Sequence, residues 1–215
     1  TEIYTLSLHD ALPISDHEIE AFTDMLARHG IVTVADVRST PYSRFNPSFN
    51  RETLARSLAR RAVSYVFLGA ELGGKGGDFP DASGAARYAL IAASERFARG
   101  LDRLRTVMVE GPTAIMCAER DPLDCHRTLL VSRALRTPGV AIRHILYDGA
   151  VEDHADTERR MVGRAGLATA DLFDTTEGTL ERAYDILADM AAGRGTAGET
   201  STEREDGGTG GGASP

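Results

Sequence analysis

Two short stretches of the 215-residue sequence gather the side chains most able to do chemistry. "DVRSTPYSR" combines a carboxylate with arginines and hydroxyls, and "MCAERDPLDCHR" adds cysteine and histidine. A cysteine beside a histidine and an arginine is the usual material for nucleophilic catalysis or anion binding. We therefore predict one site built from both stretches. Its catalytic candidates are Cys125, His126, Glu119 and Asp36, and its substrate-binding candidates are Arg38, Ser43, Arg44 and Arg127.

The setting of Cys125 favours a reactive thiol. Asp121-Pro122 is typical of a helix N-cap followed by proline at the first helical position, which places Cys125 in the first turns of a helix. The helix dipole, with Arg127 and His126 nearby, favours the thiolate, whereas Asp124 opposes it. We expect Arg38 and Arg44, on the other motif, to clamp a phosphate or a carboxylate.

Simpler interpretations of the same residues stay open. Cys117, inside an apolar run, is more often a small core residue than a reactant. Asp36 and Glu119 can serve only to tie down loops by accepting backbone N–H groups. Cys125 can be buried and inert, with His126 on the solvent face.

Metal, cofactor and nucleotide-loop signals are weak. Cys117, Cys125 and His126 offer three zinc ligands, but the cysteine separation is not that of a zinc knuckle, so no metal site is predicted and no cofactor is assigned. "ELGGKGGDF" lacks the Gly-Lys-Ser/Thr ending of a P-loop. We expect it to be a mobile lid or a close-approach loop beside the site.

Strands and helices alternate around these motifs. Apolar, β-branched runs predict strands at 31–37, 63–69, 113–119 and 140–146, and helical periodicity predicts helices over about 15–30, 50–62, 85–104 and 121–135. This order predicts a three-layer, Rossmann-like α/β fold, with a parallel sheet of about four to five strands and helices on both faces. Ligands of such sheets bind at the carboxyl ends of the strands. The two motifs therefore face each other across one crevice if their strands are neighbours.

The chain beyond Asp148 has a different character. "HADTERRMVGRAG" and "TLERAYDILADMAA" predict a helical C-terminal extension. From Gly193 the chain has no apolar residue larger than alanine, which indicates a disordered tail. The predicted organisation is a single domain over 15–192 and a tail over 193–215.

Composition limits the partners and the location. The net charge of −8 falls to −4 without the tail and the first fourteen residues, which leaves no electrostatic footprint for duplex nucleic acid. No apolar run is long enough to span a bilayer and no signal peptide is visible, so we predict a cytoplasmic protein with no membrane partner. A small anionic ligand is the expected partner.

The two motifs, together with "VSYVFLGAELGG", resemble the family called domain of unknown function 488 over about 22–149. The resemblance implies a compact Rossmann-like domain of bacteria and archaea with no established activity. It also places nine residues at the family's motif positions: Asp36, Arg38, Pro41, Ser43, Arg44, Glu119, Cys125, His126 and Arg127. We predict an enzyme acting on a small anionic or nucleotide-like substrate. The alternative is a non-catalytic nucleotide or phosphometabolite sensor.

The N-terminal stretch stands apart. Thr1 to Ile14 resemble the translation of a sequencing adapter, so we predict that this segment is artefactual and exclude His9 and Asp10 from the site. Members of the family normally begin with a strand similar to "IYTIGHS" before the first helix. Because residues Ile3 to Ser7 alternate in the same way, we expect them to form a strand in that place.

Overall fold

A central sheet organises the molecule in the computed structural model, which describes residues 2–7, 16–75, 78–167 and 176–199. Within these residues the sheet has six strands in the order β3-β2-β4-β1-β5-β6. The strands are β1 (Glu2–Ser7), β2 (Thr33–Asp36), β3 (Ser64–Phe67), β4 (Thr113–Cys117), β5 (Ala141–Ile145) and β6 (Val151–Asp153). All neighbouring strands pair in parallel except β6, which is antiparallel to β5. The predicted α/β class is confirmed.

Helices connect the strands and cover both faces of the sheet. The α-helices are α1 (Asp16–Arg28), α2 (Arg51–Ala59), α3 (Gly69–Leu72), α4 (Gly84–Ala92), α5 (Glu95–Glu110), α6 (Arg133–Leu135), α7 (His154–Arg164) and α8 (Thr176–Glu199). The 3₁₀ helices η1 (Pro47–Phe49) and η2 (Pro122–Asp124) and the π-helix η3 (Arg127–Ser132) complete the set. None of the helices in the described part of the chain combines the length and the apolarity that crossing a bilayer requires.

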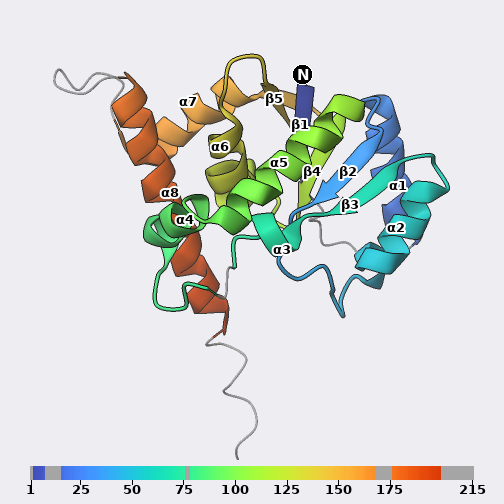
Figure 1. The fold of residues 1–215 in the computed structure, drawn as a ribbon, viewed down its shortest axis with the longest axis horizontal. Coiled ribbons are helices and arrows are strands. Elements are labelled where there is room, and N and C mark those ends of the chain that lie inside the picture. The colour runs from blue at the N-terminus through green and yellow to red at the C-terminus, as the bar shows by residue number, and fades with distance from the viewer. Residues whose placement is uncertain (1, 8–15, 76–77, 168–175, 200–215) are drawn as a thin grey trace, which may run out of the picture.

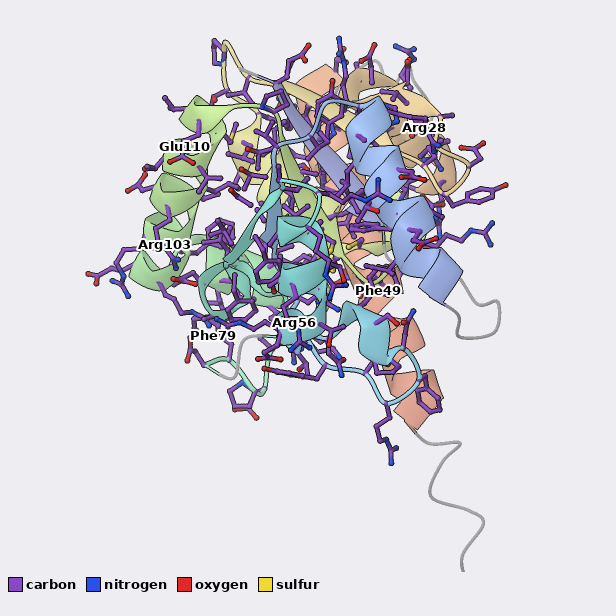
Figure 2. The ribbon with its side chains drawn as sticks, turned by 90° about the vertical axis from the view of Figure 1, so that its right-hand side faces the viewer. Arg28, Phe49, Arg56, Phe79, Arg103 and Glu110 are labelled. Atoms are coloured by element: carbon purple, nitrogen blue, oxygen red, sulfur yellow. The ribbon has the colours of Figure 1, made fainter. Side chains whose placement is uncertain are left out.

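Alternation along the strands builds two separate cores. In β4, Ala114 and Met116 pack among the residues of α1 and α2, whereas Ile115 and Cys117 pack on the opposite side with α5. Figure 2 shows the consequence, with Arg28 on α1 and Glu110 on α5 lying on opposite sides of the sheet. The three predicted layers follow from this alternation, because each face of a sheet needs its own apolar cover.

The predicted helical C-terminal extension is present as α7 and α8. These helices share a third apolar cluster with η2 and η3, in which Tyr184 and Leu187 are fully buried. Arg133 and Arg136 hold α8 through Glu181. Figure 1 shows α8 along one side of the molecule beside α4, away from α1 and α2. The helix reaches Glu199 and so runs past Gly193, where the sequence indicated disorder, and residues 200–215 lie outside the described part.

Two sequence-based boundaries differ from the structure. The single helix predicted over 85–104 is two helices, because Ser94 caps a new one: its Oγ accepts from the Phe97 N–H at 3.2 Å. Among the described residues the sheet has six strands rather than four to five, since the short β6 joins it in addition to the expected N-terminal strand.

The N-terminal strand forms as expected. β1 lies in the middle of the sheet between β4 and β5. Its alternation sends Ile3 to one core and Tyr4 and Leu6 to the other. His9 and Asp10 lie outside the described residues.

Candidate functional site

The two chemical motifs meet because their strands are neighbours. β2 pairs with β4 in parallel, so Asp36 lies opposite Met116 and both strands end at the same edge of the sheet. The Nε2 of His126 donates to the Val37 carbonyl at 3.0 Å, which ties the second motif directly to the end of β2. The predicted meeting of the two motifs is confirmed.

Cys125 precedes the helix that was expected to contain it. Asp121 does act as a cap, because its carboxylate accepts from the Leu123 N–H at 2.9 Å, but the helix it starts is the single 3₁₀ turn η2. Cys125 itself is extended, and η3 begins only at Arg127. Because Cys125 lies outside a helix, the helix dipole is not the main influence on whether its thiol ionises.

Four side chains form a tight cluster at this edge. The Oε2 of Glu119 accepts from the Sγ of Cys117 at 2.8 Å and from the Sγ of Cys125 at 3.0 Å. The Nδ1 of His126 lies 3.4 Å from the Cys117 Sγ. One ligand atom from each of the four residues lies within 4.8 Å of all the others. Cys117, Cys125 and His126 are buried, and Glu119 is partly buried.

The electrostatics of the cluster are set by burial first. Burial raises the pKa of the Cys125 thiol well above its ordinary value, and neighbouring Cys117 and Glu119 raise it further. Arg127 does lower the pKa of Cys125, as the sequence suggested, but burial and the other neighbours outweigh it. The expected preference for the thiolate of Cys125 was wrong for this reason.

Glu119 and His126 support each other's charge. Burial by itself raises the pKa of Glu119, but His126 and the two thiol hydrogen bonds bring that pKa down to about 2. Burial by itself lowers the pKa of His126, yet its interactions with Cys125 and Glu119, and its bond to Val37, leave the pKa raised overall. The cluster therefore favours a carboxylate facing an imidazolium.

Arg127 acts on the backbone of the site. It is fully buried, and its guanidinium donates to the carbonyls of Glu119 at 2.6 Å and Arg120 at 3.4 Å. Its amide N–H donates to the Cys125 Sγ at 3.4 Å. Arg127 thus fixes the loop that carries Glu119, and it is absent from the lining of the cavity described below.

Asp36 holds Arg38 in place. The Nε and Nη2 of Arg38 donate to the two oxygens of Asp36 at 2.9 and 2.7 Å, and Nη2 also donates to the Phe49 carbonyl at 3.0 Å. The hydroxyl of Tyr65 donates to the same carboxylate at 2.7 Å. Such bidentate geometry fixes the guanidinium plane. Asp36 is completely buried, so it contacts Arg38 and not the cavity.

A cavity of about 720 Å³ lies above the cluster, a volume typical of small-molecule sites. Its walls come from the ends of β2 and β4, the loop after α3, the start of α4, and α8. Its lining residues are Arg38, Ser39, Thr40, Gly74, Lys75, Ser83, Gly84, Arg87, Tyr88, Cys117, Ala118, Glu119, Asp124, His126, Ala188, Ala191 and Ala192. The cavity combines three of the cluster's side chains with three cationic ones.

The predicted site residues divide between this cavity and its supports. Arg38, Glu119 and His126 line the cavity, whereas Asp36, Cys125 and Arg127 stand behind it. Ser43 accepts two local N–H groups within its own loop, and Arg44 is exposed over the ring of Phe45, so the structure does not bring either into the lining.

The sequence predicted that the glycine-rich loop is either a mobile lid or a close-approach loop. The structure confirms the close approach. A Cβ at Gly74 would lie 2.8 Å from the Cβ and Cγ of His126, so only glycine lets the loop pack on this ring. The Lys75 N–H donates to the Ser39 Oγ at 3.0 Å. The loop thereby brings Lys75 into the lining. A lid motion of this loop stays a prediction.

Sequence reasoning missed several lining residues. Cys117 was assigned to the core, and Lys75, Ser83 and Arg87 were not considered for the site. Lys75, the only lysine of the chain, was the one available signal. Nothing local marked the alanines of α8, because they reach the cavity only through the docking of that helix.

Together, the fold and the site define an α/β protein with a cavity at the carboxyl ends of its parallel strands, lined by cysteine, histidine and cationic side chains. Residues 18–134, more than half of the chain, match the family described as "Domain of unknown function DUF488". The chain belongs to this family. Comparison with curated proteins and with solved structures gave no match.

Proposed function

We propose that this protein is an enzyme acting on a small anionic or nucleotide-like substrate bound in the cavity. The observation that carries the proposal is that Arg38, Lys75 and Arg87 line the same cavity as Cys117, Glu119 and His126. The cationic side chains would hold the anionic part of the substrate, and the cluster would face its reacting part.

Two of the cationic side chains, Arg38 and Arg87, are held in place and keep capacity for a ligand. Asp36 and Phe49 occupy the Nε and Nη2 of Arg38, which leaves its Nη1 without a hydrogen-bond partner among the described residues. Arg87 donates its Nε to the Ala82 carbonyl at 2.6 Å, which orients its guanidinium. The hydroxyl-bearing Ser39 and Ser83 lie in the same lining and supply neutral partners for anionic oxygens.

The alternative is a non-catalytic sensor that uses the same cavity. The burial of Cys125, which raises the pKa of its thiol, favours this alternative because a protonated thiol is a poor nucleophile. Cys117 lines the cavity, so it is the thiol that a substrate would meet first. The nucleophilic role that the sequence suggested for Cys125 therefore stays a prediction.

Binding of inorganic phosphate and of AMP to the full chain, measured by isothermal titration calorimetry, tests the proposal. We expect Arg87→Ala to weaken binding at least about tenfold, which corresponds to about 1.4 kcal/mol. Arg99→Ala is the matched control, since Arg99 is an exposed arginine on α5 outside the lining. Equal affinities of the two variants, or no binding by the folded wild type, would contradict an anion site here.

Iodoacetamide labelling with mass spectrometry separates the two candidate functions. If the protein is an enzyme that uses a thiol, iodoacetamide should label Cys117 before Cys125, and bound AMP should protect Cys117. Cys117→Ser should then abolish any turnover. If the protein is a sensor, Cys117→Ser and Cys125→Ser should both keep ligand-induced thermal stabilisation.

Both cysteines are free thiols, which supports the reducing, cytoplasmic location that we propose.

A further inference from the structure

The cluster beneath the cavity has the composition of a transition-metal centre. Two cysteines, a histidine and a glutamate each place one ligand atom within 4.8 Å of the others. Thiolate, imidazole and carboxylate are the three protein ligands of Zn²⁺, and four of them complete a tetrahedral site. The separation of the two cysteines along the chain had argued against a zinc site. That argument did not count Glu119 as a ligand, and it did not foresee that the fold brings Cys117 close to Cys125 and His126.

The separations suit one ion at the centre. In a tetrahedral site with metal–sulfur bonds of about 2.3 Å and metal–nitrogen or metal–oxygen bonds of about 2.1 Å, ligand atoms lie about 3.4 to 3.8 Å apart. The Cys117 Sγ is 3.4 Å from the His126 Nδ1, and both thiols lie 2.8 to 3.0 Å from the Glu119 Oε2. A small outward shift of Glu119 reaches tetrahedral spacing.

His126 is already oriented as a ligand. Its Nε2 donates to the Val37 carbonyl at 3.0 Å, which leaves Nδ1 pointing at the cluster. A ring nitrogen bonded to a backbone carbonyl is the usual support of a metal-binding histidine, because it fixes both the tautomer and the ring plane. Gly74 packs against this ring and restricts its movement further.

Arg127 supplies the compensating charge. Its guanidinium is fully buried, donates only to backbone carbonyls among the described residues, and keeps an unpartnered Nε. A divalent ion with two thiolates and one carboxylate carries a net charge of −1, which a buried cation stabilises. The Arg127 amide also donates to the Cys125 Sγ, as backbone N–H groups do to metal-bound thiolates.

We propose that Cys117, Glu119, Cys125 and His126 bind one divalent ion of the zinc class at the floor of the cavity. Binding displaces the two thiol protons that now bridge to Glu119 and, from the imidazolium form of His126, the Nδ1 proton, so one ion enters and three protons leave. This site goes beyond the proposed function, because it forms whether or not an anion occupies the cavity. Three of its four ligands line the cavity, so a bound ion lies within reach of a ligand there.

Titration of the reduced, metal-free full chain with Co²⁺ tests the proposal. We expect a thiolate-to-Co²⁺ charge-transfer band and tetrahedral visible bands that saturate at one ion per chain, and Zn²⁺ should displace them. Elemental analysis of protein purified from zinc-supplemented cells should give the same stoichiometry. His29→Gln, a histidine outside the cluster, is the matched control and should bind as the wild type does.

Substitution of the ligands separates this site from adventitious binding. Cys117→Ser and Cys125→Ser should each lose or strongly reduce the charge-transfer band. Glu119→Gln keeps both thiols and should weaken Co²⁺ affinity about tenfold or more while retaining the band. A folded, reduced wild type with two titratable thiols and no such band overturns the proposal, as does a folded double Cys→Ser variant that binds Co²⁺ as before. If the cysteine variants do not fold, the wild-type spectrum and Glu119→Gln still decide.

Phosphate calorimetry on the metal-free and the Zn²⁺-loaded chain keeps the two proposals apart. Metal binding with no phosphate binding in either form would refute the anion site and leave the metal centre standing. Phosphate binding that depends on Arg87, with no thiolate-to-Co²⁺ band, would refute the metal centre and leave the anion site standing.

Discussion

At the scale of single residues, the site depends on side chains that hydrogen bonds and ion pairs fix in position. The Asp36 carboxylate accepts hydrogen bonds from Arg38 and Tyr65, and the Arg127 guanidinium donates to two backbone carbonyls. Seven polar residues of the two motifs line the cavity, and others, such as Asp36 and Arg127, keep them in position. A buried charge that loses its partner is costly, so these supports should matter for stability as well as function.

Replacing Asp36 tests the first of these supports. Asp36→Ala leaves Arg38, a residue only 7 % exposed, without the carboxylate that pairs with its guanidinium. We expect the free energy of unfolding to fall by about 3 to 5 kcal/mol, measured by urea denaturation. Asp24→Ala removes the carboxylate of an exposed pair with Arg61 and should cost no more than about 1 kcal/mol. Similar costs for the two variants would show that the Asp36 pair is not structural.

Gly74 tests the close approach to His126. Gly74→Ala places a Cβ 2.8 Å from two carbons of a buried ring, so we expect a loss of about 1 to 3 kcal/mol in the free energy of unfolding. Gly163 in α7 has nothing within 4 Å of a Cβ, and Gly163→Ala should instead stabilise by up to about 1 kcal/mol. Thermal unfolding of both variants gives the comparison. An unchanged stability of Gly74→Ala would mean that the loop moves freely.

At the scale of elements, buried polar contacts as well as apolar ones dock the C-terminal helices onto the sheet. His144 on β5 contacts Thr5 of β1 at 2.6 Å and His154 of α7 at 2.8 Å. His154 in turn lies 3.0 Å from the Tyr184 hydroxyl of α8. This chain of contacts joins β1, β5, α7 and α8, so its protonation state bears on the docking of both helices.

The stability of this docking should depend on pH. Burial lowers the pKa of His144 well below its ordinary value, so the folded state holds it neutral. Its unfolded pKa is about 6.5, so its contribution is complete above that pH and is lost as pH falls below it. We expect a slope of up to about 1.4 kcal/mol per pH unit from urea denaturation below pH 6.5.

His144→Gln should remove most of that slope, and His29→Gln should keep it. The difference between the two variants isolates His144 from the carboxylates that also titrate in acid. Parallel curves for His144→Gln and the wild type would contradict a neutral, buried His144.

At the scale of the whole molecule, the cavity exists because distant parts of the chain converge. Its floor comes from β4 and the turn before η3, and its far wall comes from α8. Its cationic side chains are those of Arg38, Lys75 and Arg87. Asp189 of α8 accepts from the Ala85 N–H of α4 at 2.8 Å, which joins the two helices that close the cavity. The family match ends at residue 134, so α8 adds a wall from outside the matched region.

That wall should shape what the cavity binds. Ala192→Leu projects a larger side chain from α8 into the lining, so we expect AMP to bind about tenfold more weakly and phosphate to bind almost as before, because the smaller anion needs less room. Met190→Leu alters an exposed residue of the same helix and should leave both affinities unchanged. Calorimetry with the two ligands makes the measurement, and equal effects on both would argue that α8 does not limit the cavity.

The sequence by itself determined the architecture and the region of the site. Short apolar runs and helical periodicities are local patterns, and they specified β2, β3, β4 and β5 and the alternation that produces three layers. The polar residues after two of these runs marked the motifs, because a side chain just beyond a buried strand lies at the ligand-binding edge of a parallel sheet.

Only the tertiary structure decided which of those residues face the cavity. The sequence favoured Cys125 over Cys117, but the extended backbone at Cys125 turns its thiol into the core, while Cys117 at the end of β4 reaches the lining. The wall from α8 likewise depends on contacts across tens of residues. The carboxylate partner of Arg38 and the carbonyl partners of Arg127 lie within eight residues of them along the chain, but only the folded backbone shows which groups those side chains meet. Burial and long-range neighbours set the pKa of a thiol and the direction of a side chain, and neither is encoded in local spacing.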